Sequence, residues 1–251
     1  MEMNTEEIIN KFIEDFLKIK NEGFIESHRS HNTGIGKTFE DLIGVAENNS
    51  QMNDYMNLIE IKSQRKKAES YITLFTKSPT NPVNANKILK ESYGYPDSKF
   101  PSVKILHTSI FYNEYNNCKG KYGFKLELEN DKLVLLIKDL NDLKIVSNEI
   151  HWNFKTLQEI VNTKCSIIAF ISADTKKSGD KEFFHFTKCN LLFNFTFDKF
   201  LKAIKNNDIM FNIRIGSYKT GDKIGFPHDH GSGFRIHKTN LNKYFDIKEI
   251  F

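Results

Sequence analysis

The sequence has 251 residues, of which 39% are hydrophobic and 27% are charged, and its formal net charge is +4. These values exclude an intrinsically disordered chain, and no segment approaches the roughly 20 apolar residues of a membrane-spanning helix. The N-terminal residues lack the basic and apolar regions of a signal peptide. The three cysteines, Cys118, Cys165 and Cys189, are widely spaced, which argues against a disulfide framework or a cysteine-based zinc site. We therefore expect a cytoplasmic protein with one large domain or two lobes.

The first half of the chain is predicted to alternate helices and strands. Residues 4–21 have helical hydrophobic spacing, with Asn4 as a cap and Glu7 three residues later. A polar stretch then leads to Gly34 and a short helix that carries Phe39. The other expected elements are a polar loop over 48–53, strands over 58–62 and 71–76, a loop with Pro79 and Pro82, and a helix over 85–93.

The second half is predicted to be rich in strands. The expected elements are strands over 103–111, 124–128 and 133–137, a helix over 154–162, a strand over 166–171, a helix over 196–205, and strands over 209–215 and 234–237. The apolar run 166–171 is typical of a buried central strand. The predicted fold class is α/β, a mixed sheet with flanking helices that is largely antiparallel in its second half.

The segment Gly34-Ile35-Gly36-Lys37-Thr38 ends like a phosphate-binding loop but does not complete its pattern. That pattern, GxxxxGK[ST], has a glycine five positions before Gly36, where this sequence has His31. The residues before it also do not form the buried strand that such a loop follows. We therefore expect these glycines to allow a close approach that directs the following helix, rather than to bind a nucleotide.

A strand of alternating polarity carries the first candidate site. Glu60 and Lys62 share one face of the strand, about 6.6 Å apart, while Ile59 and Ile61 point into a core. Asp54 lies at the entrance to the strand, where a bend can bring its carboxylate beside Glu60. Two carboxylates and a lysine suit Mg²⁺, which would polarise a phosphodiester while Lys62 orients or activates the attacking water. The alternative is a solvated face with a cross-strand ion pair.

Glu40 is a further candidate for this site. In the predicted helix after Thr38, the residues Phe39, Leu42 and Ile43 define the buried face, and Glu40 falls within about 60° of Ile43. We expect Glu40 at the edge of the packed face, able to reach a site against the sheet. The alternative is an exposed glutamate that the helix dipole favours in the first turn.

Arginine is rare in this chain, with four residues against 32 lysines. Its planar fork binds phosphates and guanine edges in a bidentate way, so the positions that keep arginine are informative. Arg214 lies opposite the apolar face of the strand 209–215, and Arg235 lies opposite the apolar face of the strand 234–237. If the two strands pair, both arginines emerge on one polar surface.

A second polar cluster, His228, Asp229 and His230, lies between those strands. Arginine and histidine donate to guanine O6 and N7, and aspartate accepts from cytosine N4, so Arg214, Arg235 and this cluster are candidates for DNA binding. The alternatives are a metal site, because HxH spacing can chelate, and a purely structural loop. A metal is disfavoured because no third ligand is nearby and Asp229 would point away from the histidines in an extended segment.

Several longer sequence motifs, which include the candidate residues named above, are distributed along nearly the whole chain. They are residues 32–42 (NTGIGKTFEDL), 59–62 (IEIK), 74–82 (LFTKSPTNP), 213–216 (IRIG), 228–231 (HDHG) and 234–236 (FRI). In this order they resemble the MvaI/BcnI family of type II restriction endonucleases. The resemblance implies a restriction-endonuclease-like PD-(D/E)xK fold, similar to MutH, with a catalytic lobe over residues 1–165 and a DNA-recognition lobe over 166–251 around a DNA cleft.

The resemblance also implies an active site and a substrate. Glu40, Asp54, Glu60 and Lys62 match the active-site motif, with Asp54, Glu60 and the Ile61 carbonyl as Mg²⁺ ligands. Family members act as monomers that nick the two strands of double-stranded DNA in separate events, which here implies 5′-phosphates and a CC(A/T)GG-like (CCWGG) site. Such an enzyme implies a protective DNA methyltransferase in the same cell, without a stable complex.

One departure from the family pattern and two rival functions remain open at this point. The stretch from Asp54 to Glu60 is one residue longer than in the family and lacks the proline before the aspartate. The rivals are a MutH-like strand-nicking repair endonuclease and a non-catalytic DNA-binding protein. The arginine and histidine cluster argues against the first, and the presence of Glu60 and Lys62 argues against the second.

Overall fold

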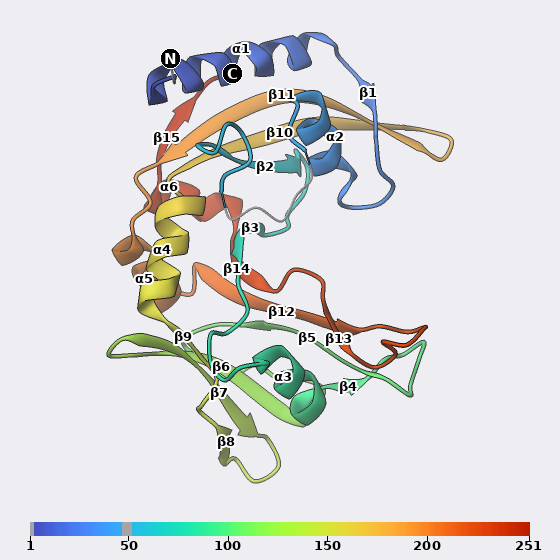
Figure 1. Ribbon diagram of the computed structural model, residues 1–251, viewed down its shortest axis with the longest axis vertical. Helices are drawn as coiled ribbons and strands as arrows, with labels where there is room; N and C mark the ends of the chain where they lie inside the picture. Colours follow the sequence, from blue (N-terminus) through green and yellow to red (C-terminus); the bar gives the residue numbers. More distant parts are fainter. Residues whose placement is uncertain (1–2, 47–51) are drawn as a thin grey trace. The chain divides into compact units, whose positions relative to one another are not determined.

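A computed structural model describes residues 3–46 and 52–251 of the chain (Figure 1). The chain forms two compact units, one of residues 1–72, 161–196 and 238–251, and the other of residues 73–160 and 197–237. This division is interleaved, whereas the sequence suggests a single boundary after residue 165. The difference arises because the strand after residue 165 pairs with the strand of Glu60. The assignment of catalytic and recognition roles to the two lobes stays a prediction.

The first unit is built on one mixed sheet. Its strands are β1 (Ile25–Glu26), β2 (Glu60–Arg65), β10 (Ile167–Ser178), β11 (Lys181–Phe193) and β15 (Asp246–Glu249). The order is β1-β11-β10-β2, and β15 pairs with β11. Strands β2 and β10 run parallel, with Glu60 opposite Ile168, and β10 and β11 form a long antiparallel hairpin. The strand that carries the candidate site therefore lies at an edge of this sheet.

Two helices, α1 (Thr5–Asn21) and α2 (Gly34–Leu42), cover one face of this sheet (Figure 1). Helix α1 begins with the predicted capping box, in which Asn4 and Glu7 each accept a hydrogen bond from the backbone N–H of the other. The core between helices and sheet holds Phe12 and Phe16 of α1, Phe39 of α2, the strand residues Ile61, Ile171 and Phe186, and Ile59, which directly precedes β2. The short η1 (Lys238–Asn240) and α6 (Leu241–Tyr244) precede β15.

The second unit contains two further sheets. One has the order β3-β14-β12-β5-β4, with β13 paired to β12, and the other has the order β6-β7-β8, with β9 paired to β7. The bounds are β3 (Ile72–Thr76), β4 (Tyr95–Pro96), β5 (Lys104–Ile110), β6 (Tyr122–Glu129), β7 (Lys132–Asp139), β8 (Ile145–Ser147), β9 (His151–Asn153), β12 (Ile209–Ser217), β13 (Pro227–Asp229) and β14 (Gly233–Ile236). The core is aromatic, with Trp152, Phe200, Phe211 and Phe234 in mutual ring contact.

The remaining helices are α3 (Ala85–Tyr93), α4 (Phe154–Lys164) and α5 (Phe197–Lys205). These helices and the mixed α/β class confirm the sequence predictions. The predicted central strand over 166–171 forms the first part of β10, and the rest of β10 together with β11 is the main element that the sequence analysis missed. Residues 174–182 of the β10–β11 hairpin are mostly exposed and polar, so no hydrophobic alternation marks them, and the ladder of backbone hydrogen bonds holds them.

The predicted polar loop 48–53 falls mostly outside the described residues. Among the helices that the structure describes, none has the length and apolar character needed to cross a membrane.

Candidate active site

Gly34 makes the close approach that the sequence predicts, whereas a Cβ on Gly36 would meet only Glu40 Oε1 at 3.7 Å, which is an ordinary contact. The segment 34–38 lies within helix α2 and not in a phosphate-binding loop. A Cβ on Gly34 would lie 2.3 Å from the Arg29 carbonyl oxygen, so no other residue fits there without moving the backbone. Thr38 is buried; its hydroxyl donates to the Gly34 carbonyl at 2.7 Å and accepts from the His28 N–H at 2.9 Å. These contacts fix the start of α2 against the preceding loop.

Strand β2 presents Glu60 and Lys62 on one face, as the alternation predicts. The Lys62 ammonium lies 2.6 Å from Glu60 Oε1. The neighbours on the opposite face, Ile59 and Ile61, are buried in the core. Glu60 itself is only 5% exposed, so its negative charge requires nearby cations or a metal.

Asp54 reaches the same strand through a tight turn. Met56 and Asn57 both adopt left-handed backbone conformations, with φ of 48° and 58°, and backbone hydrogen bonds join Tyr55 and Ile59 across the turn. The stretch between Asp54 and Glu60 is folded back in this way. Asp54 Oδ2 accepts the backbone N–H of Ile61 at 2.9 Å. Its other oxygen accepts no hydrogen bond from any residue in the described ranges.

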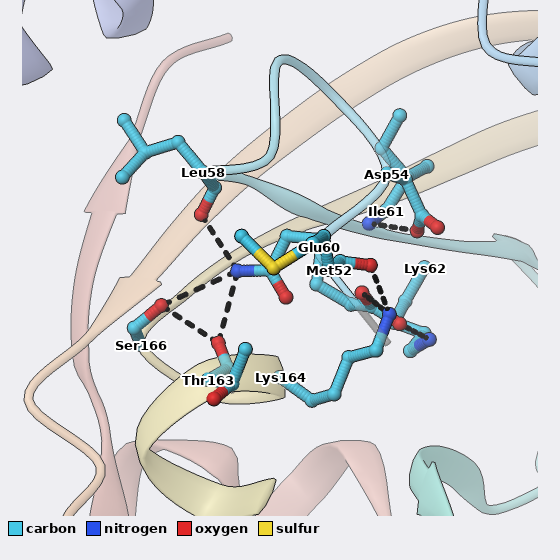
Figure 2. A network of polar contacts seen from close by, with 10 residues as sticks. Met52, Asp54, Leu58, Glu60, Ile61, Lys62, Thr163, Lys164 and Ser166 are labelled. Carbon is cyan, nitrogen blue, oxygen red and sulfur yellow. Dashed lines mark hydrogen bonds and ion pairs between the residues drawn. The ribbon is translucent and has the colours of Figure 1, made fainter. Parts of the chain in front are cut away.

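Figure 2 shows a second lysine at this site, which the sequence analysis missed. Lys164 is the last residue of α4, and its ammonium lies 3.0 Å from Glu60 Oε2 and 2.6 Å from the Met52 carbonyl oxygen. The parallel pairing of β10 with β2 brings the end of α4 to the start of β2. No local pattern distinguishes this lysine from the 31 others in the chain, so only the tertiary structure identifies it.

Asn53 ties the turn that carries Asp54 to the end of α4. Its amide nitrogen lies 2.8 Å from the Leu58 carbonyl oxygen, 2.9 Å from the Thr163 carbonyl oxygen and 3.4 Å from Ser166 Oγ. The side chain is buried. These contacts link both polypeptide segments that supply groups to Glu60.

We expect Asn53→Ala to lower the free energy of unfolding by roughly 1–3 kcal/mol, because the Leu58 carbonyl loses its Asn53 donor and the Thr163 carbonyl keeps only the donation from Ser166. Urea unfolding of the metal-free protein measures this loss. Asn242→Ala, an exchange of the same residue type at an exposed position of α6 in the same unit, is the control. Equal stability of the wild-type protein and the Asn53 variant would contradict the role of this side chain.

Cys165, which follows Lys164, is fully buried. Burial raises the pKa of its thiol to about 12. The thiol is therefore protonated at neutral pH and is not a nucleophile. Burial likewise raises the pKa of Cys118 and Cys189.

Glu40 is half-buried on α2, and this helix packs against β2. The predicted place of Glu40 at the edge of the packed face therefore agrees with its exposure. Its participation in the site with Glu60 stays a prediction.

The predicted arginine surface lies in the second unit. Strand β14 pairs antiparallel with β12, and Arg214 and Arg235 both emerge on the side opposite their buried neighbours. Burial lowers the pKa of Arg235, and the positive charge of Arg214 lowers it further. The two cations are therefore close enough to interact. Arg65, in contrast, forms an ion pair with Glu182 at 2.6 Å within the first unit.

Asp229 organises the turn between β13 and β14. Its Oδ1 accepts the backbone N–H groups of Gly231 and Ser232 at 3.0 and 2.7 Å. Its Oδ2 lies 2.9 Å from the amide nitrogen of Asn86 and 3.5 Å from the Ser78 hydroxyl. The carboxylate thus joins this turn to the segment after β3 and to α3. Arg235 donates to the Gly231 carbonyl of the same turn at 3.1 Å.

The histidines of this region form a stack beside the turn. His228 lies parallel to Tyr218 with ring centroids 4.6 Å apart, and His230 is 4.4 Å from His228. His107 of β5 contacts His230 edge to face. Burial is the main cause that lowers the pKa of His107 and of His230, and the charge of Arg214 adds to it. Both imidazoles are therefore neutral at pH 7 and can donate and accept hydrogen bonds.

The arrangement at β2 is that of a PD-(D/E)xK nuclease, with a carboxylate before the strand and a Glu-x-Lys within it. The sequence profile of the MvaI/BcnI restriction endonuclease family matches residues 13–245. The chain belongs to this family, and it is a type II site-specific deoxyribonuclease.

Two solved structures are similar to the whole chain. The first is the restriction endonuclease MvaI in complex with its cognate DNA substrate, with 36% identity, a TM-score of 0.90 and full coverage of both chains. The second is MvaI in the absence of DNA, with 35% identity, a TM-score of 0.63 and full coverage of both chains. The comparison with curated proteins gave no match.

Proposed function

We propose that this protein hydrolyses phosphodiester bonds of double-stranded DNA at a short CCWGG-like site, with Mg²⁺ as its cofactor and with 5′-phosphate products. It acts as a monomer that nicks the two strands one after the other. A methyltransferase that protects the same site is expected in the same cell, without a stable complex. The observation that carries the proposal is the convergence of Asp54, Glu60 and Lys62 at the open edge of β2.

The residues present fit a hard divalent cation. Such ions bind carboxylate and carbonyl oxygens, and Asp54 offers an oxygen without a hydrogen bond among the described residues. Among the described residues, the carboxylate of Glu60 is contacted only by the ammonium groups of two lysines. In an extended strand the N–H and C=O of one residue point to the same side. Because the Ile61 N–H meets Asp54, the Ile61 carbonyl faces this side as well and is the third expected ligand.

Each residue has a defined part in the proposed reaction. Asp54, Glu60 and the Ile61 carbonyl would hold the ion, and Glu40 would complete the acidic pocket. When bound, Mg²⁺ would polarise the scissile phosphodiester and favour ionisation of the attacking water. The Lys62 ammonium, which has Glu60 Oε1 as its partner in the protein alone, orients or activates the attacking water.

The recognition residues proposed are Arg214, His228, Asp229, His230 and Arg235. Support comes from their common location around β12, β13 and β14 and from the chemistry of base recognition. Arginine forks and imidazoles match guanine O6 and N7 in the major groove. One of the two similar structures holds MvaI with its cognate DNA, which supports a related site for this chain.

Incubation with unmethylated phage DNA, with Mg²⁺ or EDTA, tests the proposal directly. We expect discrete Mg²⁺-dependent fragments whose sequenced ends share one short motif and carry 5′-phosphates. Products with only single-strand nicks would favour a MutH-like repair enzyme instead. DNA that is retarded on a gel but never cut would indicate a non-catalytic binding protein.

Arg235→Lys is expected to weaken discrimination of the site by about 1–3 kcal/mol, because lysine keeps the charge but loses the planar fork. Competition binding with the cognate duplex and with duplexes that carry one substituted guanine measures this loss. Lys202→Ala removes a positive charge from the exposed face of α5 in the same unit and serves as the control. An unchanged preference in the Arg235 variant would rule out the guanine contact.

A further inference from the structure

We propose that Lys164 is a resident counter-ion of Glu60 that sets the affinity of the active site for its divalent cation. This inference rests on the proposed metal-dependent cleavage. It starts from the observation that both oxygens of a buried carboxylate are held by ammonium groups, Oε1 by Lys62 and Oε2 by Lys164. One of these lysines belongs to the Glu-x-Lys motif, and the other comes from a helix about 100 residues away in the chain.

The two lysines are anchored differently. Lys62 has Glu60 as its one hydrogen-bond partner among the described residues. Lys164 has two acceptors, Glu60 Oε2 and the Met52 carbonyl, and the helix end that carries it is held by Asn53 through Thr163. A cation that binds Glu60 Oε1 therefore displaces Lys62 at the cost of a single hydrogen bond, whereas Lys164 stays bound to Oε2.

Because the two ammonium groups are anchored differently, they have different roles when a metal ion binds. Lys62 is released toward the attacking water when the ion binds. Lys164 remains as a fixed positive charge beside the ion, so it stabilises Glu60 when no metal is bound and opposes the metal when it arrives. Because Glu60 and Lys164 are both largely excluded from water, the interaction is screened only in part.

The test compares the binding of Mn²⁺ to the wild-type protein and to Lys164→Gln, measured from the electron paramagnetic resonance signal of the free ion. Glutamine keeps a donor for Glu60 without the charge. We expect its Kd for Mn²⁺ to fall by about fivefold to tenfold. Lys164→Arg, which keeps the charge, should bind Mn²⁺ like the wild type. Lys18→Met removes an exposed, ion-paired lysine of α1 and controls for the change in net charge.

Thermal unfolding gives a second measurement that does not depend on activity. Without metal, Lys164→Gln should melt at a lower temperature than the wild type, and saturating Mn²⁺ should raise its melting temperature by more than it raises that of the wild type. If the glutamine variant does not fold, Lys164→Met with the same measurements replaces it. Mn²⁺ binding by Lys164→Arg that is as tight as that of Lys164→Gln would overturn the role of the charge.

The outcomes separate this inference from the proposed function. A wild-type protein that binds Mn²⁺ and cuts DNA, with an unchanged or higher Kd in Lys164→Gln, overturns the counter-ion role alone. A wild-type protein that binds no Mn²⁺ and cuts no DNA overturns both. Tighter Mn²⁺ binding in the glutamine variant, with no change in the Lys18 control, supports the assignment.

Discussion

Lys62→Ala is expected to lower the rate of DNA cleavage by about 10²–10⁴-fold, the range for a positioned group that assists proton transfer. Its affinity for DNA should change by no more than about fivefold, because one phosphate-facing charge among many is lost. Single-turnover cleavage of a supercoiled plasmid measures the first quantity. Gel retardation with Ca²⁺ in place of Mg²⁺ measures the second.

The reason for the separate effects is the position of Lys62. Its ammonium contacts Glu60 at 2.6 Å, and Lys164 still neutralises that carboxylate when Lys62 is removed. The fold and the binding surface should therefore be retained. Lys66→Ala, at an exposed lysine just beyond the end of β2 that pairs with Asp174, is the matched control and should cut normally. Normal cleavage by the Lys62 variant would refute its role in activating water.

Local sequence patterns were sufficient to predict those helices and strands of which one face packs against the core. The spacing of Phe12 and Phe16 defines α1, and the alternation of Ile59 and Ile61 with Glu60 and Lys62 defines the polarity of β2. Hydrophobic periodicity encodes such elements directly. It does not encode the exposed part of the β10–β11 hairpin, because exposed strand residues carry no alternating apolar signal.

The candidate site was predictable in part for the same reason. Glu60 and Lys62 are neighbours in sequence, so strand geometry alone brings them together. The contact of Asp54 with Ile61 required the left-handed turn at Met56 and Asn57. Lys164 required the pairing of β10 with β2, which is a long-range contact that no local spacing reveals.

Among the recognition residues, Asp229 carries the largest expected structural effect. Four groups donate to its carboxylate or approach it: two backbone N–H groups of its own turn, the Asn86 amide and the Ser78 hydroxyl. Asp229→Ala should remove these contacts together. We expect a loss of roughly 2–4 kcal/mol in the free energy of unfolding and a loss of site preference, because the adjacent His230 and the Gly231 carbonyl that contacts Arg235 belong to the same turn.

Asp229→Asn distinguishes support of the turn from direct contact with a base. The remaining oxygen of the asparagine can still accept from the N–H groups of Gly231 and Ser232. The buried Asn86 Oδ1 has no partner among the described residues, so a flip of the Asn86 amide lets it accept from the new amide nitrogen. We therefore expect the asparagine variant to keep most of its stability and its preference for the site, as measured by urea unfolding and competition binding. If Asp229 instead accepts from a cytosine N4, the variant will be stable but will lose discrimination at that base pair, because its amide nitrogen then opposes another donor.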